Sequence, residues 1–463
     1  MQRLRLCAAL LLGGASLLAA REAQAQQAPA AAPAQAAPAQ AVPPAPRAPS
    51  APSAAPTPLE AAFEAAERGD LGPAERMLQT AQGDSATLLR ARLAASRYDF
   101  ALLREPALAR LAGSGDRKLR AAALAILTSA SFAAGDYRAA EGWGRRLAEA
   151  QQAGGDAERA AETGRVWRLA ALLAGRPAQT LEGAVGEGST PARVDRVGLP
   201  RIDVAVNGIL QEAVFDTGAN LSVLSTESAR RLGVTILDGT SSVGTGVQGT
   251  VPIRVGIADR LTVAGATLRN VPFLIIEDAQ LTFPVPGGYD IKAIIGLPVM
   301  RALGRMRIEQ AGRFVLAAPA EAQPAAPNMA ASGNNLFVTV AVDGRDVPMH
   351  LDTGANQSRL SALYAAAHPE AVAALPRRTA GMASAGGARL TTVATWADAP
   401  LALAGRALRL PRLEIALPAA DGPAPRFVGV LGSDVLRAFE SYTLDLRAMR
   451  LELGAPVQAA PAG

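Results

Sequence analysis

Nearly the same stretch of twelve residues occurs twice in this chain and constrains its fold more than any other feature. VFDTGANLSVLS spans 214–225, and HLDTGANQSRLS spans 350–361. Each copy places an aspartate between an apolar run and a glycine, a residue that lets the backbone turn tightly and approach a neighbour closely. The repetition predicts two related loops, each of which presents one carboxylate.

The repeat extends beyond these loops on both sides. RIDVAVNGILQEAVF and NLFVTVAVDGRDVPMHL lead into the two aspartates with the alternation and the Val/Ile content of strand pairs. Ile294-Ile295-Gly296 and Val430-Leu431-Gly432 follow, and each glycine lies 80 positions after its own aspartate. Each copy then continues with a helix-like run and a closing strand pair. The matched spacing predicts two β domains, at 192–317 and 334–454, joined by an Ala/Pro-rich linker at 318–333.

These motifs resemble those of the retropepsin-like aspartic proteases, within the wider pepsin fold. The family pattern is two apolar residues, Asp-Thr/Ser-Gly-Ala/Ser, and later an apolar-apolar-Gly motif, and the resemblance covers about 192–454. It implies two all-β acid-protease domains, a polypeptide substrate, and Asp216 and Asp352 as the catalytic pair. It implies neither a cofactor nor a metal.

Physical chemistry gives the pair a mechanism. Two such loops set face to face place their carboxylates within about 3 Å of each other, and like charges that close share one proton. One carboxylate can then take a proton from water, while the protonated partner polarises the scissile carbonyl. The sequence does not say which of Asp216 and Asp352 is the base.

Side chains beside the aspartates are predicted to support the two loops. The threonine hydroxyls can hydrogen-bond across to the opposite loop, and in the resembling family this pair locks the loops together. The glycines allow the close approach, and the serines lie near enough in sequence to support the carboxylates by hydrogen bonds. These supporting residues are Thr217, Gly218, Ser222, Thr353, Gly354 and Ser358.

Glycine-rich stretches at 243–250 and 381–388 stand where the family places a flap hairpin that closes over the peptide. Glycines would permit such a hinge. The alternative is a surface hairpin without a gating role. The flap residues predicted to bind substrate are Gly244, Gly246, Gly249, Gly386 and Gly387.

The second copy departs from the first at His350, which precedes Asp352 by two positions and shares its face on a strand. His350 is expected to tune the dyad, to bind substrate, or simply to be a satisfied, partly buried residue. With His368 as the only other histidine, no metal site is predicted. Asn220 and Asn356 stand where many retropepsins carry an acidic residue, which either alters recognition of substrate ends or has no effect.

The dyad can be assembled in two ways. The two units pair within one chain, as in pepsin, or each pairs with its copy in a second chain, as in retroviral dimers. The linker, fully extended, could span up to about 55 Å. We prefer the pairing within one chain.

Residues 59–187 are predicted to form a helical domain. Apolar residues recur at three and four positions, as in Leu119, Ala122, Ala123 and Ile126, and small or polar turns separate alanine-rich runs. The pattern resembles tetratricopeptide-type repeats. The alternative is an ordinary helical domain. Its function, if it has one, would be to bind a peptide or protein partner.

The pattern of the N-terminal residues predicts an export signal. Residues 1–25 combine Arg3 and Arg5, an apolar run and an Ala-Gln-Ala cleavage site. An uncleaved anchor is the alternative. Residues 26–58 form an Ala/Pro-rich disordered linker and 455–463 a disordered tail. The expected location is the periplasm, with no stable membrane span after cleavage.

Composition excludes several other classes of protein. The only cysteine, Cys7, lies in the predicted signal, so disulfides and thiol catalysis are excluded from the mature chain. The net charge is +5, without a basic stripe, so nucleic-acid binding has no support. The sequence therefore predicts an exported aspartic endopeptidase. The alternative is a non-catalytic periplasmic peptide-binding or scaffold protein with degenerate protease domains.

Overall fold

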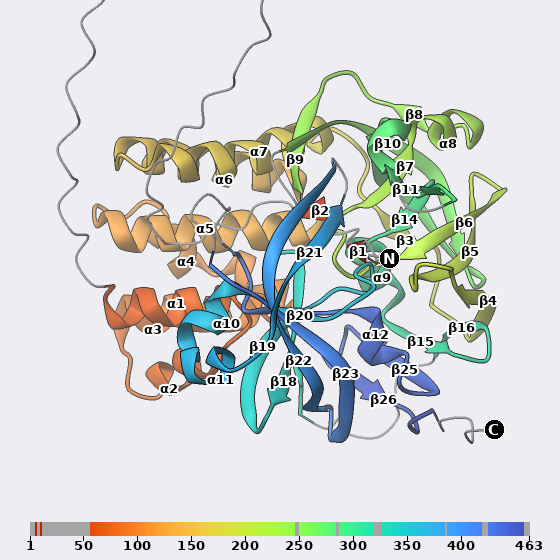
Figure 1. The fold of residues 1–463 in the computed structure, drawn as a ribbon. Coiled ribbons are helices and arrows are strands. Elements are labelled where there is room, and N and C mark those ends of the chain that lie inside the picture. The colour runs from red at the N-terminus through yellow and green to blue at the C-terminus, as the bar shows by residue number, and fades with distance from the viewer. Residues whose placement is uncertain are drawn as a thin grey trace, which may run out of the picture.

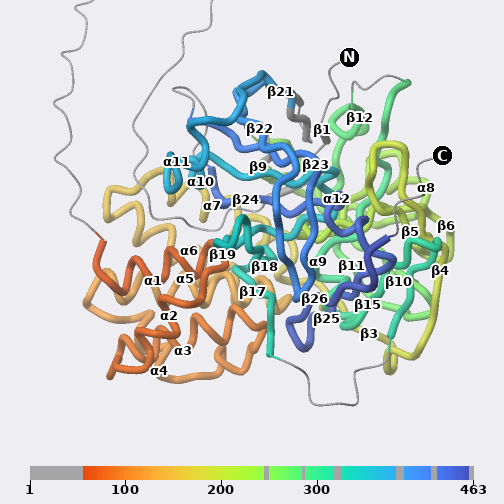
Figure 2. Tube along the Cα trace, turned by 60° about the horizontal axis from the view of Figure 1, so that its bottom comes forward, coloured from red at the N-terminus to blue at the C-terminus, as the bar shows by residue number. Residues whose placement is uncertain are grey.

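A helical N-terminal region is followed by a β-rich region, in the order that the sequence predicted (Figure 1). Figures 1 and 2 both show helices α1 to α6 gathered on one side of the molecule, away from most strands. The structure is a computed structural model. It describes residues 5–6, 10–11, 56–245, 250–283, 287–317, 326–384, 387–418 and 425–457.

Helices of the first region begin where short polar side chains cap them. The Asp116 carboxylate accepts hydrogen bonds from two N–H groups of the first turn of α5, and Gly135 ends that helix in the left-handed conformation with φ 81°. The helices are α1 Pro58–Glu67, α2 Gly72–Leu78, α3 Gly83–Ala95, α4 Pro106–Leu111, α5 Arg117–Ala134, α6 Tyr137–Ala153 and α7 Ala157–Leu173, with a 3-10 turn at Phe100–Arg104.

The helical region ends earlier than its predicted limit at residue 187. Helix α7 stops at Leu173, and Thr180–Leu181 form strand β3, which pairs with β11 of the β region. Strand β4 then begins at Gly188, before the predicted domain start at 192. Residues 180–194 are therefore part of the β region, where their backbone groups find partners in its sheet.

The strands around Asp216 form a sheet in which a hairpin leads to the aspartate. Strands β5 and β6 are joined by Asn207 and Gly208, both with positive φ, as the tight turn requires. Strand β14 lies between β6, to which it is parallel, and β7, to which it is antiparallel. The main elements are β5 Pro200–Val206, β6 Ile209–Phe215, β7 Ser222–Ser225, α8 Thr226–Arg231, β8 Thr235–Ile236, β9 Ser241–Thr245, β10 Thr250–Val263, β11 Ala266–Ile276, β12 Thr282–Phe283, β13 Tyr289–Asp290, β14 Ala293–Ile295 and α9 Leu297–Leu303.

The strands around Asp352 are paired in the same way. The turn at Asp343 and Gly344 again has positive φ, and β24 lies parallel to β19 and antiparallel to β20. The first strand, β17, begins at Met329, inside the predicted linker. The elements are β17 Met329–Ser332, β18 Asn335–Val342, β19 Arg345–Leu351, β20 Arg359–Leu360, α10 Ala362–Ala367, α11 Pro369–Ala373, β21 Arg377–Ser384, β22 Gly387–Leu403, β23 Arg406–Ala416, β24 Gly429–Leu431 and α12 Ser433–Leu436.

The two closing strand pairs do not stay within their own halves. Strand β15, Arg305–Glu309, pairs with β16, Arg313–Leu316, and also runs antiparallel to β25, Ser441–Asp445, which in turn pairs with β26, Arg450–Leu453. The sequence placed one closed pair in each domain. Because β15 pairs with β25, neither strand leaves an unpaired edge. The four closing strands of the two halves therefore lie in one sheet, which joins the halves.

Helix α7 packs on the sheet that carries Asp216. Leu169 and Leu173 of α7 are buried in one apolar cluster with Val214 of β6, Val223 of β7 and Val243 of β9. Figure 1 shows α7 alongside β9, and the two elements are in contact. The helical region is therefore anchored directly to the strands around the first aspartate.

We expect Leu169→Ala to lower the stability of the whole chain. The side chain is fully buried, and truncating such a leucine costs about 2–5 kcal/mol through lost burial and the cavity left behind. Thermal unfolding should show a lower Tm. The exposed residue Glu158 of the same helix provides the control, and equal Tm values for Leu169→Ala and Glu158→Ala would contradict the packing.

Candidate active site

Two loops carry the aspartates at the ends of strands β6 and β19. Asp216 follows Phe215, Asp352 follows Leu351, and both aspartates are fully buried. The Asp216 N–H donates to the Ile295 carbonyl at 3.1 Å, and the Asp352 N–H donates to the Leu431 carbonyl at 3.0 Å. The apolar-apolar-Gly motifs therefore fix the main chain of each aspartate.

The two loops meet face to face. A Cβ atom added to Gly218 would lie 2.7 Å from the Asp352 Cγ, and one added to Gly354 would overlap the Asp216 carboxyl group. Only glycine fits at either position, because any side chain would displace the opposite carboxyl group. In this structure, Asp216 and Asp352 therefore lie close to each other across the two loops.

Threonine side chains join the loops by reciprocal hydrogen bonds. The Thr217 hydroxyl donates to the Leu351 carbonyl at 2.7 Å and accepts from the Thr353 N–H at 3.0 Å. The Thr353 hydroxyl donates to the Phe215 carbonyl at 2.6 Å and accepts from the Thr217 N–H at 3.0 Å. All four bonds are buried, so each hydroxyl satisfies two main-chain groups of the opposite loop.

Proximity changes the acidity of the pair. Burial, the charge of Asp352 and a hydrogen bond with it raise the pKa of Asp216 well above its usual value. The Gly218 N–H, which donates to Asp216 Oδ1 at 2.8 Å, acts in the opposite direction. Because two ionised carboxylates in such close contact would repel each other, the pair retains a proton at a pH where a free aspartate has lost it.

Ser222 and Ser358 act one step further from the carboxylates than the sequence suggested. The Ser222 hydroxyl accepts from the Gly296 N–H at 3.1 Å, and the Ser358 hydroxyl accepts from the Gly432 N–H at 2.9 Å. A Cβ added to Gly296 would lie 2.7 Å from the Ala219 carbonyl oxygen. The serines therefore hold the downstream glycines against the loops and support the aspartates indirectly.

Asp434 belongs to this arrangement and was not singled out from the sequence. Its carboxyl group accepts from the Ser358 hydroxyl at 2.6 Å and from the Ser358 N–H at 2.9 Å, and burial raises its pKa. Pro298 occupies the same place after Gly296 in the first copy. The contrast between GSD at 432–434 and GLP at 296–298 was the available signal, and it makes the two loops chemically unequal.

Hairpins stand at both predicted flap positions. Gly244 of β9 pairs with Thr250 of β10, and Gly387 of β22 pairs with Ser384 of β21. The other predicted flap residues, Gly246, Gly249 and Gly386, lie outside the described residues.

Two short N-terminal strands pair with these hairpins. Strand β1, Arg5–Leu6, runs parallel to β21, and strand β2, Leu10–Leu11, runs antiparallel to β9. One hairpin from each half of the β region thus pairs its main chain with one of these two strands.

Asn220 and Asn356 link each aspartate loop to the opposite half of the β region. The Asn356 side-chain amide donates to the main-chain carbonyl of Val197 at 3.1 Å. The main-chain carbonyl of Asn220 accepts from the Asn334 side-chain amide at 2.9 Å. Val197 and Asn334 belong to the turns that precede the first hairpin strands. These contacts give both asparagines a place in the joint between the halves.

His350 is held between aromatic rings. Its imidazole stacks on Phe427 with centroids 4.4 Å apart and meets Phe337 edge-on. Burial, with the charges of Arg426 and Arg359, lowers the pKa of His350 to about 3. A ring that stays neutral at ordinary pH argues against a role in tuning the dyad by charge. The side chain is almost fully buried rather than partly buried, and its Nε2 has no hydrogen-bond partner among the described residues, so the expectation of a satisfied histidine was wrong.

The described part of the chain holds neither a metal-ligating cluster nor a membrane-spanning helix. Over those residues, no three or more His, Cys, Asp or Glu side chains are grouped so that they could hold a metal ion. None of the helices there combines the length and apolar character needed to cross a membrane.

Comparison with known proteins identifies part of this region. Residues 202–299 match the family model described as aspartyl protease. The matched segment contains Asp216 and Ile294-Ile295-Gly296, so it includes the first loop and the motif that fixes it. The match supports an aspartyl protease domain and a peptidase activity. No curated protein matches the chain.

Thr217→Ala should weaken the joint between the loops. It leaves the Leu351 carbonyl and the Thr353 N–H buried without their partner, at a cost of about 1–3 kcal/mol for each unsatisfied group. We expect a clearly lower Tm. Thr217→Ser, which keeps the hydroxyl, should stay near the wild type, and an equal loss in both variants would argue against these hydrogen bonds as the cause.

The raised pKa of Asp216 also predicts how stability depends on pH. Between the pKa of an unfolded aspartate, about 3.9, and the raised folded value, the native protein binds a proton that the unfolded chain has released. Stability therefore falls as the pH rises through this range. Asp216→Asn removes this titration, so the variant should gain Tm relative to the wild type as the pH increases. Parallel Tm–pH curves would contradict the shift.

Proposed function

We propose that this protein is an exported aspartic endopeptidase whose Asp216 and Asp352, from one chain, share a proton and activate a water molecule. The observation that carries the proposal is the reciprocal approach of the loops, in which each glycine lies against the opposite carboxyl group. The aspartyl protease match over 202–299 supports it.

The proposed reaction needs only these two groups and water. The ionised carboxylate takes a proton from water as the water oxygen bonds to the scissile carbonyl carbon, and the protonated carboxyl group gives its proton to the carbonyl oxygen. The resulting gem-diol collapses as the leaving nitrogen gains a proton from the dyad and the C–N bond breaks. At the same time the other carboxylate takes a proton from one hydroxyl of the gem-diol. The products are a carboxylic acid and an amine, and the dyad again holds one proton.

Assembly of the dyad within one chain has two independent supports. The threonine bonds join residues 136 positions apart in the same chain. Strand β15 of the first half pairs with β25 of the second half along its whole length. The matched strand pairings of the two halves further support a tandem duplication of a retropepsin-like domain. A chain built in this way does not need a second copy to complete its site.

The substrate class follows from the hairpins. Main-chain pairing of β1 with β21 and of β2 with β9 supports an extended polypeptide as the substrate, bound between one hairpin from each half. Because main-chain pairing is independent of side chains, unstructured segments of many sequences would fit.

Export to the periplasm rests on residues 1–25 alone. Apart from β1 and β2, these residues lie outside the described part of the chain. The helical region, compared above with tetratricopeptide repeats, would then hold the protease to a partner or substrate protein. Its anchorage on β9 through α7 supports a direct influence on the first hairpin.

Cleavage of an unstructured protein tests the proposed function. Asp216→Asn and Asp352→Asn should each reduce the cleavage rate by roughly 10²–10⁴-fold, because general acid–base catalysis contributes that much. Asp346→Asn, an exposed change on β19, is the matched control. Unchanged activity in both dyad variants would reject the dyad, whereas an inactive wild type would favour the non-catalytic alternative.

Mixing the two inactive variants tests assembly. If the dyad forms within one chain, an equimolar mixture of Asp216→Asn and Asp352→Asn chains stays inactive, because no molecule holds both carboxylates. Activity regained on mixing would indicate pairing between chains. Activity lost in only one of the single variants would indicate same-unit pairing between chains or one degenerate unit.

A further inference from the structure

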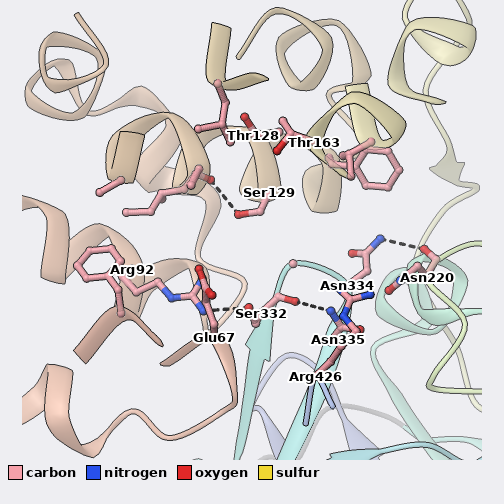
Figure 3. Close-up of a pocket in the computed structure, with 18 of the residues that line it drawn as sticks. Glu67, Arg92, Thr128, Ser129, Thr163, Asn220, Ser332, Asn334, Asn335 and Arg426 are labelled. Carbon is pink, nitrogen blue, oxygen red and sulfur yellow. Dashed lines mark hydrogen bonds between the residues drawn. The ribbon is translucent and has the colours of Figure 1, made fainter. Parts of the chain in front are cut away.

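A cavity of about 110 Å³ lies where the helical region meets the second half of the β region (Figure 3). Residues of α1, α3, α5, α6 and α7 form one side, and the turn between β17 and β18, at 332–335, forms the other. An engineered cavity of about 150 Å³ holds a benzene molecule. By this comparison, the cavity is large enough for a ligand group of roughly four or five heavy atoms.

One wall of the cavity carries a buried arginine. Arg92 of α3 is only 5% exposed, and its Nη2 donates to the Ser332 hydroxyl at 2.9 Å. Its Nε–H has no hydrogen-bond partner among the described residues. A buried guanidinium is costly unless a hydrogen-bonding partner of opposite charge compensates it. Arg92 thus presents an unused donor to the cavity.

The charge of Glu67 acts on Arg92 through space, but the two side chains do not pair directly. Glu67 of α1 also lines the cavity, but no ion pair joins it to Arg92 within the described part of the chain, although Figure 3 shows the two side chains close together. Burial raises the pKa of Glu67 to about 7, so this carboxyl group is only partly ionised at neutral pH. Arg426 adds a second positive charge to the lining. The local balance is therefore positive.

The rest of the cavity wall favours a ligand with an apolar body and one amide N–H. Aliphatic and aromatic side chains cover much of the wall, while Asn335, 5% exposed, has a side-chain oxygen without a hydrogen-bond partner in the described chain. That oxygen can accept an N–H from a ligand. The apolar lining residues are Phe63, Ile126, Phe132, Leu147, Val166 and Phe427.

We propose that this cavity binds a carboxylate attached to a short apolar body, with Arg92 as the group that holds the carboxylate. Two sources share this chemistry: a free aliphatic acid and the C-terminal residue of a peptide. The second adds an amide N–H for Asn335. The cavity also borders Asn220, four positions after Asp216, so a peptide end bound here would lie beside the first aspartate loop.

Isothermal titration calorimetry on the full-length protein tests the site independently of any peptidase activity. The probes are propionate and N-acetyl-alanine, which share a carboxylate end that fits the cavity, each compared with its amide. We expect both acids to bind at least tenfold more tightly than the amides, because a charge-assisted bond to Arg92 is lost with the carboxylate. Tighter binding of N-acetyl-alanine would identify the peptide end as the better source, and equal binding would identify the carboxylate alone.

Arg92→Met should weaken acid binding at least tenfold, whereas Arg90→Met, an exposed change on the same helix, should not alter it. Ala122→Leu keeps the arginine but fills the cavity from α5, so it should also abolish binding. If Arg92→Met fails to fold, the binding measured for Ala122→Leu tests the proposal in its place. The proposal is overturned if the acids do not bind at millimolar concentration, if the amides bind equally well, or if Ala122→Leu binds like the wild type.

Discussion

Four buried hydrogen bonds made by Thr217 and Thr353 are the interaction on which the rest of the site depends. Each hydroxyl serves one donor and one acceptor of the opposite loop, so the two main chains cannot move apart without leaving buried polar groups unsatisfied. The loops are held so close that only glycine fits at positions 218 and 354. Burial and mutual repulsion then keep a proton on the aspartate pair.

This joint requires both halves of the β region to be held in one fixed arrangement. Strands β15 and β25 provide it through five paired positions of main chain, from Arg305 opposite Asp445 to Glu309 opposite Ser441. The side-chain amide of Asn356, with its bond to the Val197 carbonyl, ties the same halves beside the loops. Helix α7 supports the first sheet from outside through Leu169 and Leu173. The geometry of two side chains is thus set by long-range pairing throughout the chain.

Local chemistry explains how much the sequence alone could predict. The aspartate loops, the turns at Asn207 and Asp343 and both hairpins follow from residue types and periodicity within short segments. The pairing of β15 with β25 and the role of Asp434 depend on contacts between distant segments, which no local pattern encodes. For a similar reason the sequence did not show that helix α7 stops at Leu173 and that β3 follows it, since the partner of β3 lies on β11. The cavity around Arg92 requires three-dimensional packing and had no signal in the sequence.

The shared proton is the central claim, and nuclear magnetic resonance of ¹³C-labelled aspartate carboxyl groups tests it most directly. The account predicts that the buried pair titrates in two widely separated steps, one of them well above the range of ordinary aspartates, and that Asp352→Asn moves the remaining Asp216 resonance to a lower pKa by removing its charged neighbour. Two carboxyl groups that titrate independently near the ordinary aspartate value, unaffected by the substitution of each other, would contradict the account.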